Sequence, residues 1–435
     1  MVESKFNIYY TTPDGTQLLF NSVSCALAIV DETYVELVRC LPSLTDENVP
    51  ETLKECYQAA KEGHFIVGTD YDEMLDLTTK RKLIQYKTDE LRLTIAPTLG
   101  CNFKCIYCYE EAKQGLMSKE VQNSLVDFVE NQRKRLRNLS VTWYGGEPLL
   151  AKNIIYDLSK RLINICDANG IAFEASMVSN GSLLNDETIQ KLIEYKVDNI
   201  QITIDGTPET HNKRRVSKSG QGSFDTIIDN INKILKAEKI SVGIRINVDK
   251  SNMEELPALL KILSDRLISK NVFISFGQVK VYTKACQSVE KTCYTNPEFA
   301  IELFSFQKLL EEFGFTEWND IPYPQQALIY CGAERLNTFV VDPQGFLYKC
   351  WNVVGMTQHA VGNITDKMFE ITNARNGYWM QRSPMKDSKC KECKLIPVCM
   401  GGCPYNDMIA KTGFQCEAVK YNLKHSLLEY YKKSL

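Results

Sequence analysis

Apolar and polar residues alternate in the central part of the chain, and amphipathic stretches with a period near 3.6 residues lie between these alternations. The strands that this pattern predicts are 91–96, 140–144, 173–178, 200–204, 241–248 and 272–276. The predicted helices are 153–168, 186–195, 223–237 and 253–268, and one capped by Ser118 that carries Val121, Leu125, Phe128 and Val129 on one face. Such alternation is typical of βαβ units and a parallel sheet. Six strands are too few for a closed eight-stranded barrel, so we expect an open, partial barrel.

Residues 1–90 have a different pattern. Alternating segments at 5–10 and 17–21 flank the turn signal Pro13-Asp14-Gly15, which predicts a hairpin. Helical spacing begins at Asp31-Glu32, a second helix is predicted at 50–60, and a third strand at 65–67. This segment predicts a small α+β unit, separate from the partial barrel.

The pattern changes again after the last predicted strand. Residues 286–330 have no clear period, and the chain from 331 onward is rich in cysteine and loops, with a final helix at 418–431. We therefore expect four segments, 1–90, 91–285, 286–330 and 331–435.

Composition and charge exclude several classes of protein. Of the 435 residues, 44% are hydrophobic and 24% are charged, which excludes disordered and fibrous proteins. The net charge of −3 argues against a general nucleic-acid binder, and no apolar run approaches the length of a membrane span. The first ten residues lack the pattern of a signal peptide, so we expect a cytoplasmic protein with no membrane partner. Its sixteen cysteines are then expected to be reduced, and clustered ones to hold metal.

Three cysteines stand close together directly after the first barrel strand, in the motif Cys101-x3-Cys105-x2-Cys108. Three thiolates on one loop can bind three irons of a [4Fe–4S] cluster and leave the fourth iron open to a small ligand. A zinc site or uncoordinated thiols are the alternatives, but zinc needs a fourth ligand and no histidine lies nearby.

The segment Cys101–Cys108, with Tyr109-Glu110 after it, resembles the signature loop of the radical S-adenosylmethionine (SAM) superfamily. The resemblance covers about residues 91–280 and implies a partial (β/α)6 TIM-like barrel. It also implies that the open iron chelates the amino and carboxylate groups of SAM.

Later strand ends carry further matches, and the resemblance implies their roles. Gly145-Gly146-Glu147-Pro148 resembles a stretch that contacts the SAM amino group, and Ser179-Asn180-Gly181 resembles a segment at the end of the third strand. Of the adjacent arginines we favour Arg215 over Arg214 for the SAM carboxylate. The other candidates are Arg245 for the carboxylate, Asn247 for the ribose, Tyr107 near the adenine and Asp205 as a base or a sugar contact. Each polar residue could instead support the fold.

The C-terminal cysteines resemble a SPASM domain, which holds auxiliary [4Fe–4S] clusters, and the expected seven are Cys331, Cys350, Cys390, Cys393, Cys399, Cys403 and Cys416. The family pattern implies one complete cluster on Cys390, Cys393, Cys399 and Cys416. A second cluster would have Cys331, Cys350 and Cys403, one ligand short. That cluster is then either open, for a substrate thiolate, or completed by Cys286 or Cys293. The alternatives are zinc sites of the Cys-x2-Cys type and, for Cys286 and Cys293, buried thiols without a metal.

The resemblance implies a radical reaction on a peptide. SAM accepts an electron and cleaves to methionine and a 5′-deoxyadenosyl radical, which takes a hydrogen atom from an unreactive carbon. The N-terminal unit is similar to the winged-helix-like element that recognises the leader of a ribosomally made peptide, although a dimerisation or capping unit would fit too. We therefore expect a radical SAM oxidoreductase that installs a thioether or carbon–carbon cross-link in a precursor peptide. A low-potential donor such as flavodoxin or ferredoxin is the expected electron source.

Two other functions remain. One is anaerobic sulfatase maturation, which forms formylglycine, and the missing fourth cysteine and the extra N-terminal unit count against it. The other is a non-catalytic iron–sulfur scaffold or electron carrier, which would need neither the Gly145–Pro148 motif nor an open cluster.

Overall fold

The computed structural model describes residues 1–110, 115–316 and 323–434, and packing divides the chain into two compact units. Unit 1 joins 1–85 with 321–331 and 382–435, and unit 2 joins 86–320 with 332–381. The four expected segments follow sequence motifs whereas the units follow packing, so the segment boundaries stay a prediction. Part of the expected 286–330 segment, residues 317–322, lies outside the described residues.

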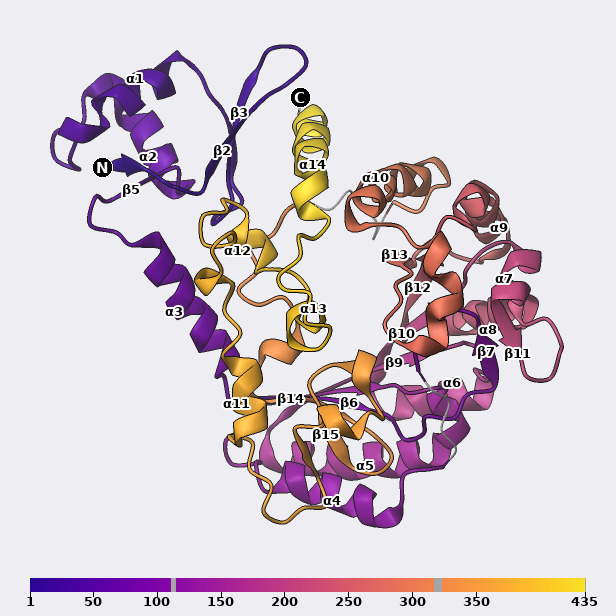
Figure 1. Ribbon diagram of the computed structural model, residues 1–435. Helices are drawn as coiled ribbons and strands as arrows, with labels where there is room; N and C mark the ends of the chain where they lie inside the picture. The colour runs from indigo at the N-terminus through magenta and orange to yellow at the C-terminus, as the bar shows by residue number, and fades with distance from the viewer. Residues whose placement is uncertain (111–114, 317–322, 435) are drawn as a thin grey trace. The chain divides into compact units, whose positions relative to one another are not determined.

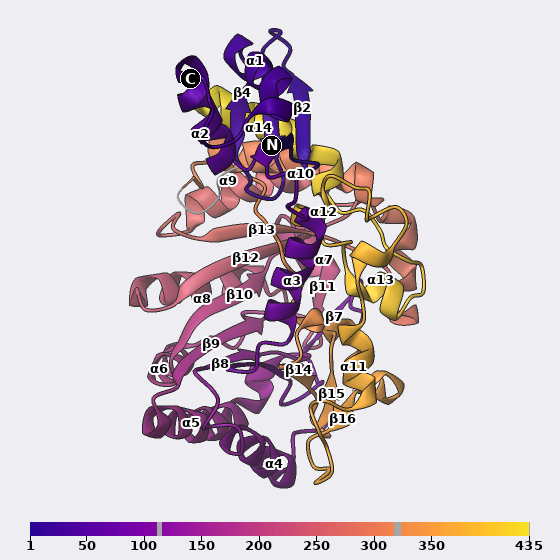
Figure 2. The same cartoon turned by 90° about the vertical axis from the view of Figure 1, so that its left-hand side faces the viewer.

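Unit 2 is built on a sheet that has nine strands within the described residues, in the order β13-β12-β10-β9-β8-β6-β14-β15-β16 (Figure 2). Their bounds are β6 Glu90–Ile95, β8 Asn138–Trp143, β9 Ala172–Ser179, β10 Val197–Thr203, β12 Ser241–Val248, β13 Phe273–Gln278, β14 Thr338–Val341, β15 Phe346–Tyr348 and β16 Gly362–Asn363. Six strands of this sheet pair in parallel, namely β6, β8, β9, β10, β12 and β13. The predicted α/β fold with a mainly parallel sheet is therefore confirmed.

Amphipathic helices alternate with these strands along the chain and cover one face of the sheet (Figure 1). They are α4 Lys119–Glu130, α5 Lys152–Asn169, α6 Asp186–Glu194, α8 Phe224–Ala237 and α9 Leu256–Arg266. The Oγ of Ser118 accepts a hydrogen bond from the N–H of Val121 at 3.2 Å, so the predicted cap of α4 is confirmed. Among the described residues, no helix is both long and apolar enough to cross a membrane.

Several elements of unit 2 were not predicted. β14 joins the sheet beside β6, in parallel, and brings β15 and β16 with it. A short antiparallel pair joins β7 Phe103–Cys105 to β11 Arg215–Ser217, just after helix α7 Pro208–Arg214. Helix α10 Asn296–Glu312 begins at a capping box of Thr295 and Glu298, and α11 spans Ala374–Met380. The strands among these unpredicted elements have two to four residues each, too few for a period to be read in the sequence.

The N-terminal part of unit 1 contains the predicted hairpin and helices. β2 Asn7–Thr11, β3 Gln17–Asn21 and β4 Leu27–Ile29 form one antiparallel sheet, and β1 Val2–Glu3 pairs with β5 Ile66–Val67. The helices are α1 Glu32–Cys40, α2 Lys54–Glu62 and α3 Glu73–Gln85. Tyr34, Leu37 and Leu41 pack in a core with residues of α2 and β5. α3, which was not predicted, buries Glu73, Leu77, Arg81 and Gln85, one residue every fourth position.

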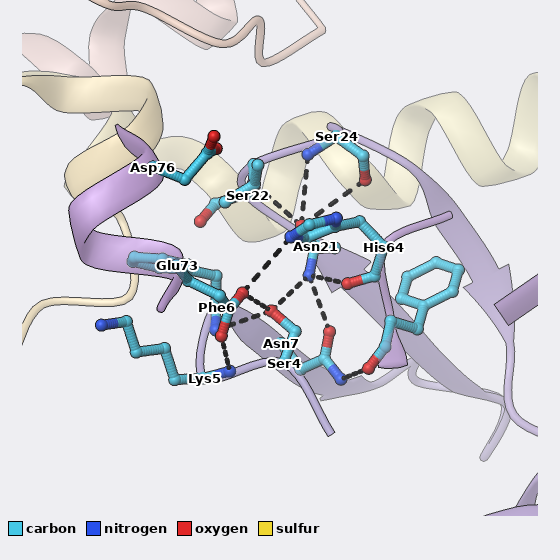
Figure 3. Close-up of polar contacts among 12 residues, drawn as sticks. Ser4, Lys5, Phe6, Asn7, Asn21, Ser22, Ser24, His64, Glu73 and Asp76 are labelled. Atoms are coloured by element: carbon cyan, nitrogen blue, oxygen red, sulfur yellow. Dashed lines mark hydrogen bonds and ion pairs between the residues drawn. The ribbon is translucent and has the colours of Figure 1, made fainter. Parts of the chain in front are cut away.

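A buried polar network joins the start of α3 to the strands of this part (Figure 3). The Nδ2 of Asn21 donates to the Oγ of Ser4, the Oδ1 of Asn7 and the carbonyl of His64, at 2.7 to 3.0 Å. The carboxylate of Glu73 accepts from the Oγ of Ser4 at 2.5 Å and lies 3.4 Å from the Nε2 of His64. Because these groups are hydrogen-bonded, the polar side chains tolerate burial in the N-terminal part.

The C-terminal elements of unit 1 pack on this N-terminal part. They are α12 Ile396–Cys399, α13 Pro404–Met408 and α14 Val419–Ser434. Phe6 and Leu77 share a core with Ile396 and Met400, and a second core joins Phe20 to residues of α14. The first segment of the chain and the last therefore fold as one compact unit.

Candidate functional site

The loop that carries the first three cysteines is held against a second loop by the approach of two backbones. The N–H of Glu147 donates to the carbonyl of Gly100 at 2.9 Å. A Cβ on Gly145 would lie 2.2 Å from the carbonyl oxygen of Thr98, and one on Gly146 would lie 2.4 Å from that of Gly100. No other residue type fits at these two positions without moving the loop. The glycines of the predicted motif therefore determine the path of the backbone just before Cys101.

The three thiols of this loop lie close enough to influence one another electrostatically. Cys101 and Cys105 are partly buried and Cys108 is exposed. Burial is the main cause that raises the pKa of Cys101 to about 11 and that of Cys108 to about 12, and neighbouring thiols add to both effects. Thiols with such raised pKa values stay protonated near neutral pH unless a cation such as iron binds them.

The carboxylate of Glu147 is fully buried and accepts hydrogen bonds from the protein itself. Its oxygens accept from the N–H of Leu149 at 3.0 Å, the N–H of Asn180 at 2.7 Å and the hydroxyl of Ser179 at 3.0 Å. It thereby connects the end of β8 to the end of β9. Pro148 is buried and begins the short 3₁₀ helix that follows. The backbone carbonyls of the motif remain the candidates for an ammonium group.

A second link between the cysteine loop and β9 was not predicted. The Oδ1 of Asn102 accepts from the Nδ2 of Asn180 at 2.7 Å, and the Nδ2 of Asn102 donates to the Oγ of Ser182 at 3.0 Å. Because Asn102 stands beside Cys101 in a motif defined by cysteines, its side chain gave no separate signal in the sequence.

Arg214 and Arg215 face different partners. The Nη1 of Arg214 donates to both carboxylate oxygens of Asp249 at 3.1 Å, and both side chains are buried. Arg215 stands opposite Cys105 in the β7–β11 pair, and its Nη1 donates to the hydroxyl of Tyr107 at 2.7 Å. The Nε of Arg215 is buried and has no hydrogen-bond partner among the described residues. The Nε of Arg214 has no partner among the described residues either, but Arg214 donates to both oxygens of Asp249, whereas Arg215 approaches Asp205 only to 3.8 Å. Arg215 is therefore the better candidate for a bound carboxylate.

Four of the predicted site residues form one hydrogen-bonded group. The hydroxyl of Tyr107 donates to Asp205 and accepts from the Nδ2 of Asn247 at 3.3 Å. The other carboxylate oxygen of Asp205 accepts from the N–H of Asn247 at 2.8 Å, and the Nη1 of Arg215 lies 3.8 Å from Asp205. The structure thus brings the ends of β10 and β12 together with the cysteine loop.

Arg245 lies at the border of this group. Its Nε donates to the Oδ1 of Asn247 at 3.3 Å. A Cβ on Gly277, in the neighbouring strand β13, would lie 2.1 Å from the guanidinium of Arg245. Gly277 was not predicted, because it lies one residue beyond the predicted strand 272–276, although it falls inside β13 and its lack of a side chain permits this close approach.

The predicted ligands Cys390, Cys393, Cys399 and Cys416 belong to unit 1. Burial is the main cause of the raised pKa of Cys390 and of Cys399. The thiols of Cys399 and Cys393 also raise the pKa of Cys390, and that of Cys416 raises the pKa of Cys399. Electrostatic interactions thus link Cys390 to Cys393 and Cys399, and Cys399 to Cys416.

A buried arginine shapes the loop between Cys399 and Cys403. Arg382 donates to the carbonyls of Met400, Gly401 and Gly402 at 2.9 to 3.2 Å, and to the Oδ1 of Asp407 at 2.8 Å. The three loop residues all have left-handed backbones, with φ of 49°, 75° and 70°. The N–H of Gly401 in turn donates to the Cys399 thiol, so the loop presents its carbonyls to Arg382 and an N–H to the sulfur.

Cys350 belongs to unit 2, whereas Cys331 and Cys403 belong to unit 1, and their shared cluster stays a prediction. Trp351 stacks on Tyr144 with ring centroids 5.5 Å apart. Tyr144 is hydrogen-bonded to Tyr109, which lies near enough to the Cys350 thiol for that thiol to affect its pKa.

Cys286 and Cys293 lie near each other in a small core against Tyr107 and Tyr109. The thiol of Cys286 is buried and donates to the carbonyl of Thr283 at 3.3 Å. Their role as extra cluster ligands is still a prediction. Among the described residues, no three His, Cys, Asp or Glu side chains converge as the ligands of one metal ion do. The ligands of a four-iron cluster bind different irons and are spread more widely.

Comparisons with known proteins agree with this geometry. The sequence model of the Radical SAM superfamily matches residues 95–263, which span the cysteine loop and the strand ends described above. A curated relative, the cysteine-type anaerobic sulfatase-maturating enzyme of Clostridium novyi (strain NT), is 25% identical over 349 residues, 73% of this chain and 88% of that protein.

Two solved structures have a similar fold. "Native anSMEcpe with bound AdoMet and Cp18Cys peptide" has a TM-score of 0.60 at 21% identity and covers 79% of this chain and 98% of its own. "Streptococcus suis SuiB bound to precursor peptide SuiA" has a TM-score of 0.55 at 15% identity, with 96% of this chain and 98% of its own covered.

Proposed function

We propose that this chain is a radical SAM enzyme that installs a thioether or carbon–carbon cross-link in a ribosomally made peptide. The observation that carries the proposal is the loop of Cys101, Cys105 and Cys108, which Gly145 and Gly146 hold at the end of the first parallel strand. The order of the six parallel strands, without a closing pair between β6 and β13 among the described residues, supports a partial (β/α)6 barrel.

When bound to the three thiolates, a [4Fe–4S] cluster with SAM supplies a 5′-deoxyadenosyl radical that takes a hydrogen atom from an unreactive carbon. The chain's own residues bind and orient the reactants. We assign the SAM carboxylate to the free Nε of Arg215, with Arg245 beside it, and the SAM ammonium to the carbonyls of 145–148. Asn247 is the candidate for the ribose. Ser179 and Asn180 hold Glu147 and, through it, the loop.

Auxiliary clusters are the second part of the proposal. The electrostatic interactions that link Cys390, Cys393, Cys399 and Cys416 support one complete cluster in unit 1. Cys331, Cys350 and Cys403 are the proposed ligands of the other. A cluster held by these three thiolates would have one iron open to the thiolate of a substrate cysteine, which favours a thioether product. If Cys286 or Cys293 were the fourth ligand of this cluster, no iron would be open to a substrate thiolate.

The peptide substrate rests on the N-terminal part and on the relatives. The antiparallel sheet β2-β3-β4 has two edges, β2 and β4, to which a leader peptide can add as a further strand. A fold similarity that covers 96% of the chain, as with SuiB bound to its precursor peptide, must include most of this part. Flavodoxin or ferredoxin is the proposed reductant, and the cytoplasm the proposed location.

Sulfatase maturation is the second candidate, because the curated relative named above is a sulfatase-maturating enzyme. The two functions give different products. A cross-link removes two hydrogen atoms and keeps the sulfur, whereas formylglycine formation from cysteine removes the sulfur. Mass spectrometry of a cysteine-containing peptide after reaction therefore separates them. An iron–sulfur scaffold without catalytic activity would leave the peptide and SAM intact.

The first experiment measures iron, sulfide and 5′-deoxyadenosine after anaerobic reconstitution. We expect about twelve irons in the wild type and about eight in the variant with all three loop cysteines replaced by alanine. Only the wild type should form 5′-deoxyadenosine with dithionite and SAM. Cys40→Ala is the matched control, because this thiol lies in α1 and outside every predicted ligand set. It should keep both the iron and the activity.

Two outcomes would contradict the proposal. About four irons in the wild type, or zinc in place of the rest, would remove the auxiliary clusters. The absence of 5′-deoxyadenosine from a wild type with full iron would favour the scaffold.

A further inference from the structure

We infer that the Tyr107 hydroxyl is a positioning group, which holds Arg215 for the carboxylate of SAM while Asp205 holds Tyr107. The inference rests on the proposed function and adds a role for a side chain within the cysteine motif. Tyr107 lies between Cys105 and Cys108, so its backbone is fixed once a cluster binds both cysteines. Its hydroxyl reaches away from the loop to the ends of other strands.

The direction of each hydrogen bond around this hydroxyl follows from its partners. A guanidinium and an amide NH₂ can only donate, so Tyr107 accepts from the Nη1 of Arg215 and from the Nδ2 of Asn247. The single phenolic proton is left for Asp205, which is fully buried. The hydroxyl thus joins a carboxylate to a guanidinium that are 3.8 Å apart at Nη1 and Oδ2.

Both carboxylate oxygens of Asp205 are engaged by the protein in this arrangement. One oxygen accepts from Tyr107, and the other accepts from the N–H of Asn247 at 2.8 Å. The Nδ2 of Asn252 also donates to its backbone carbonyl at 2.7 Å. We therefore assign Asp205 to holding Tyr107 instead of moving a proton of the substrate.

The guanidinium of Arg215 has one nitrogen that is hydrogen-bonded and another that has no partner among the described residues. Its Nη1 is bonded to Tyr107, its guanidinium lies 5.7 Å from the ring centre of Phe103, and its pairing with Cys105 keeps it beside a proposed iron ligand. Its buried Nε has no hydrogen-bond partner among the described residues. A buried donor without an acceptor is costly, and a carboxylate bound there would satisfy it. Without the Tyr107 contact the guanidinium would lose the hydrogen bond that fixes its plane.

The test compares the affinity for SAM of anaerobically reconstituted wild type, Tyr107→Phe, Arg215→Lys and the double variant, by equilibrium dialysis. We expect Tyr107→Phe to weaken SAM binding about tenfold and to leave the iron content unchanged. In the Arg215→Lys background the same change should have little further effect, because Tyr107 acts through Arg215. Decarboxylated SAM should bind equally well to the wild type and Tyr107→Phe. Tyr195→Phe, whose ring stacks on Tyr156 in another part of unit 2, is the control and should match the wild type.

Three results would overturn the inference: unchanged SAM affinity in Tyr107→Phe, full additivity with Arg215→Lys, or an equal loss for decarboxylated SAM. The last would mean that Tyr107 contacts the adenosine. If Tyr107→Phe loses iron, Asp205→Asn gives the same comparison outside the cysteine loop and should weaken SAM binding to a similar extent. A wild type with full iron that binds no SAM would overturn the proposed function, and this inference with it.

Discussion

The guanidinium of Arg214 lies 3.1 Å from both carboxylate oxygens of Asp249, and the pair is buried. Its neighbours in the sequence have different surroundings. Lys213 forms an exposed ion pair with Glu209, and Arg215 faces the cysteine loop. Three consecutive cations therefore have three different environments, which mutagenesis can separate.

Replacing Arg214 by methionine should destabilise the protein strongly. Asp249 would be left buried and unpaired, a loss of about 3–5 kcal/mol in the free energy of unfolding. Lys213→Met, which removes an exposed pair, should cost less than about 1 kcal/mol. Urea unfolding of the two variants measures the difference. Equal midpoints would contradict the assignment of Arg214 to the fold, and adding Asp249→Leu to Arg214→Met should recover stability.

Alanine at position 146 should deplete iron from the first cluster. The new Cβ would lie 2.4 Å from the carbonyl oxygen of Gly100, so the cysteine loop must move away. We expect the reconstituted variant to hold about four irons fewer than the wild type and to form no 5′-deoxyadenosine. Gly377→Ala is the control, since nothing lies within 4 Å of a Cβ there and the position is inside helix α11. Full iron in Gly146→Ala would show that the loop does not need the close approach.

Acid should destabilise the wild type through His211. Burial, with the charge of Arg215 as a second cause, lowers the pKa of His211 to about 3 in the folded protein. The unfolded chain binds a proton near pH 6.5, so stability is lost as the pH falls from about 6.5 towards 3, by on the order of a few kcal/mol. His211→Gln cannot take up this proton. The free energy of unfolding of the wild type and of His211→Gln is measured at pH 7 and at pH 5. The difference between the two proteins should be smaller at pH 5, and an equal difference at both pH values would refute the prediction.

Arg382→Met should impair both auxiliary clusters, although Arg382 is not a predicted ligand. Arg382 binds the backbone carbonyls of the loop between Cys399 and Cys403. These two cysteines are assigned to different clusters. We expect about four irons in this variant, those of the first cluster, against about eight in Cys403→Ala. Continued formation of 5′-deoxyadenosine would show that unit 2 is still folded. An iron content equal to that of the wild type would exclude this role for Arg382.

Periodicity in the sequence predicted the parallel strands well, because each buries one side of a regular element. It missed pairs that depend on contacts distant in sequence. The match of Arg215 with Cys105 joins two strands of three residues each, too short to have a period. β14, with the sequence TFVV, is apolar enough for a strand, but its neighbour lies more than 240 residues away.

The sequence predicted the motifs of the candidate site better than it predicted the contacts of the individual side chains. The glycines at 145 and 146 proved to be required by the approach of a backbone. The roles of Tyr107 and Glu147 could not be read from the sequence, because each depends on which strand ends come together in space. Asn102 belongs to the same group of residues, since its partners Asn180 and Ser182 are about eighty positions away.

The pairing of β14 with β6 limits how the chain can be shortened. β6, which leads into the cysteine loop, has β8 on one side and β14 on the other. A fragment that stops before residue 332 would leave the backbone N–H and C=O groups of β6 open along that side. Unprotected edges of this kind recruit other chains and aggregate. The stretch 95–263 that carries the superfamily signature lacks β6 except for Ile95 and also lacks β13, so it would expose β8 and β12 as edges and is not expected to be a soluble protein when expressed alone.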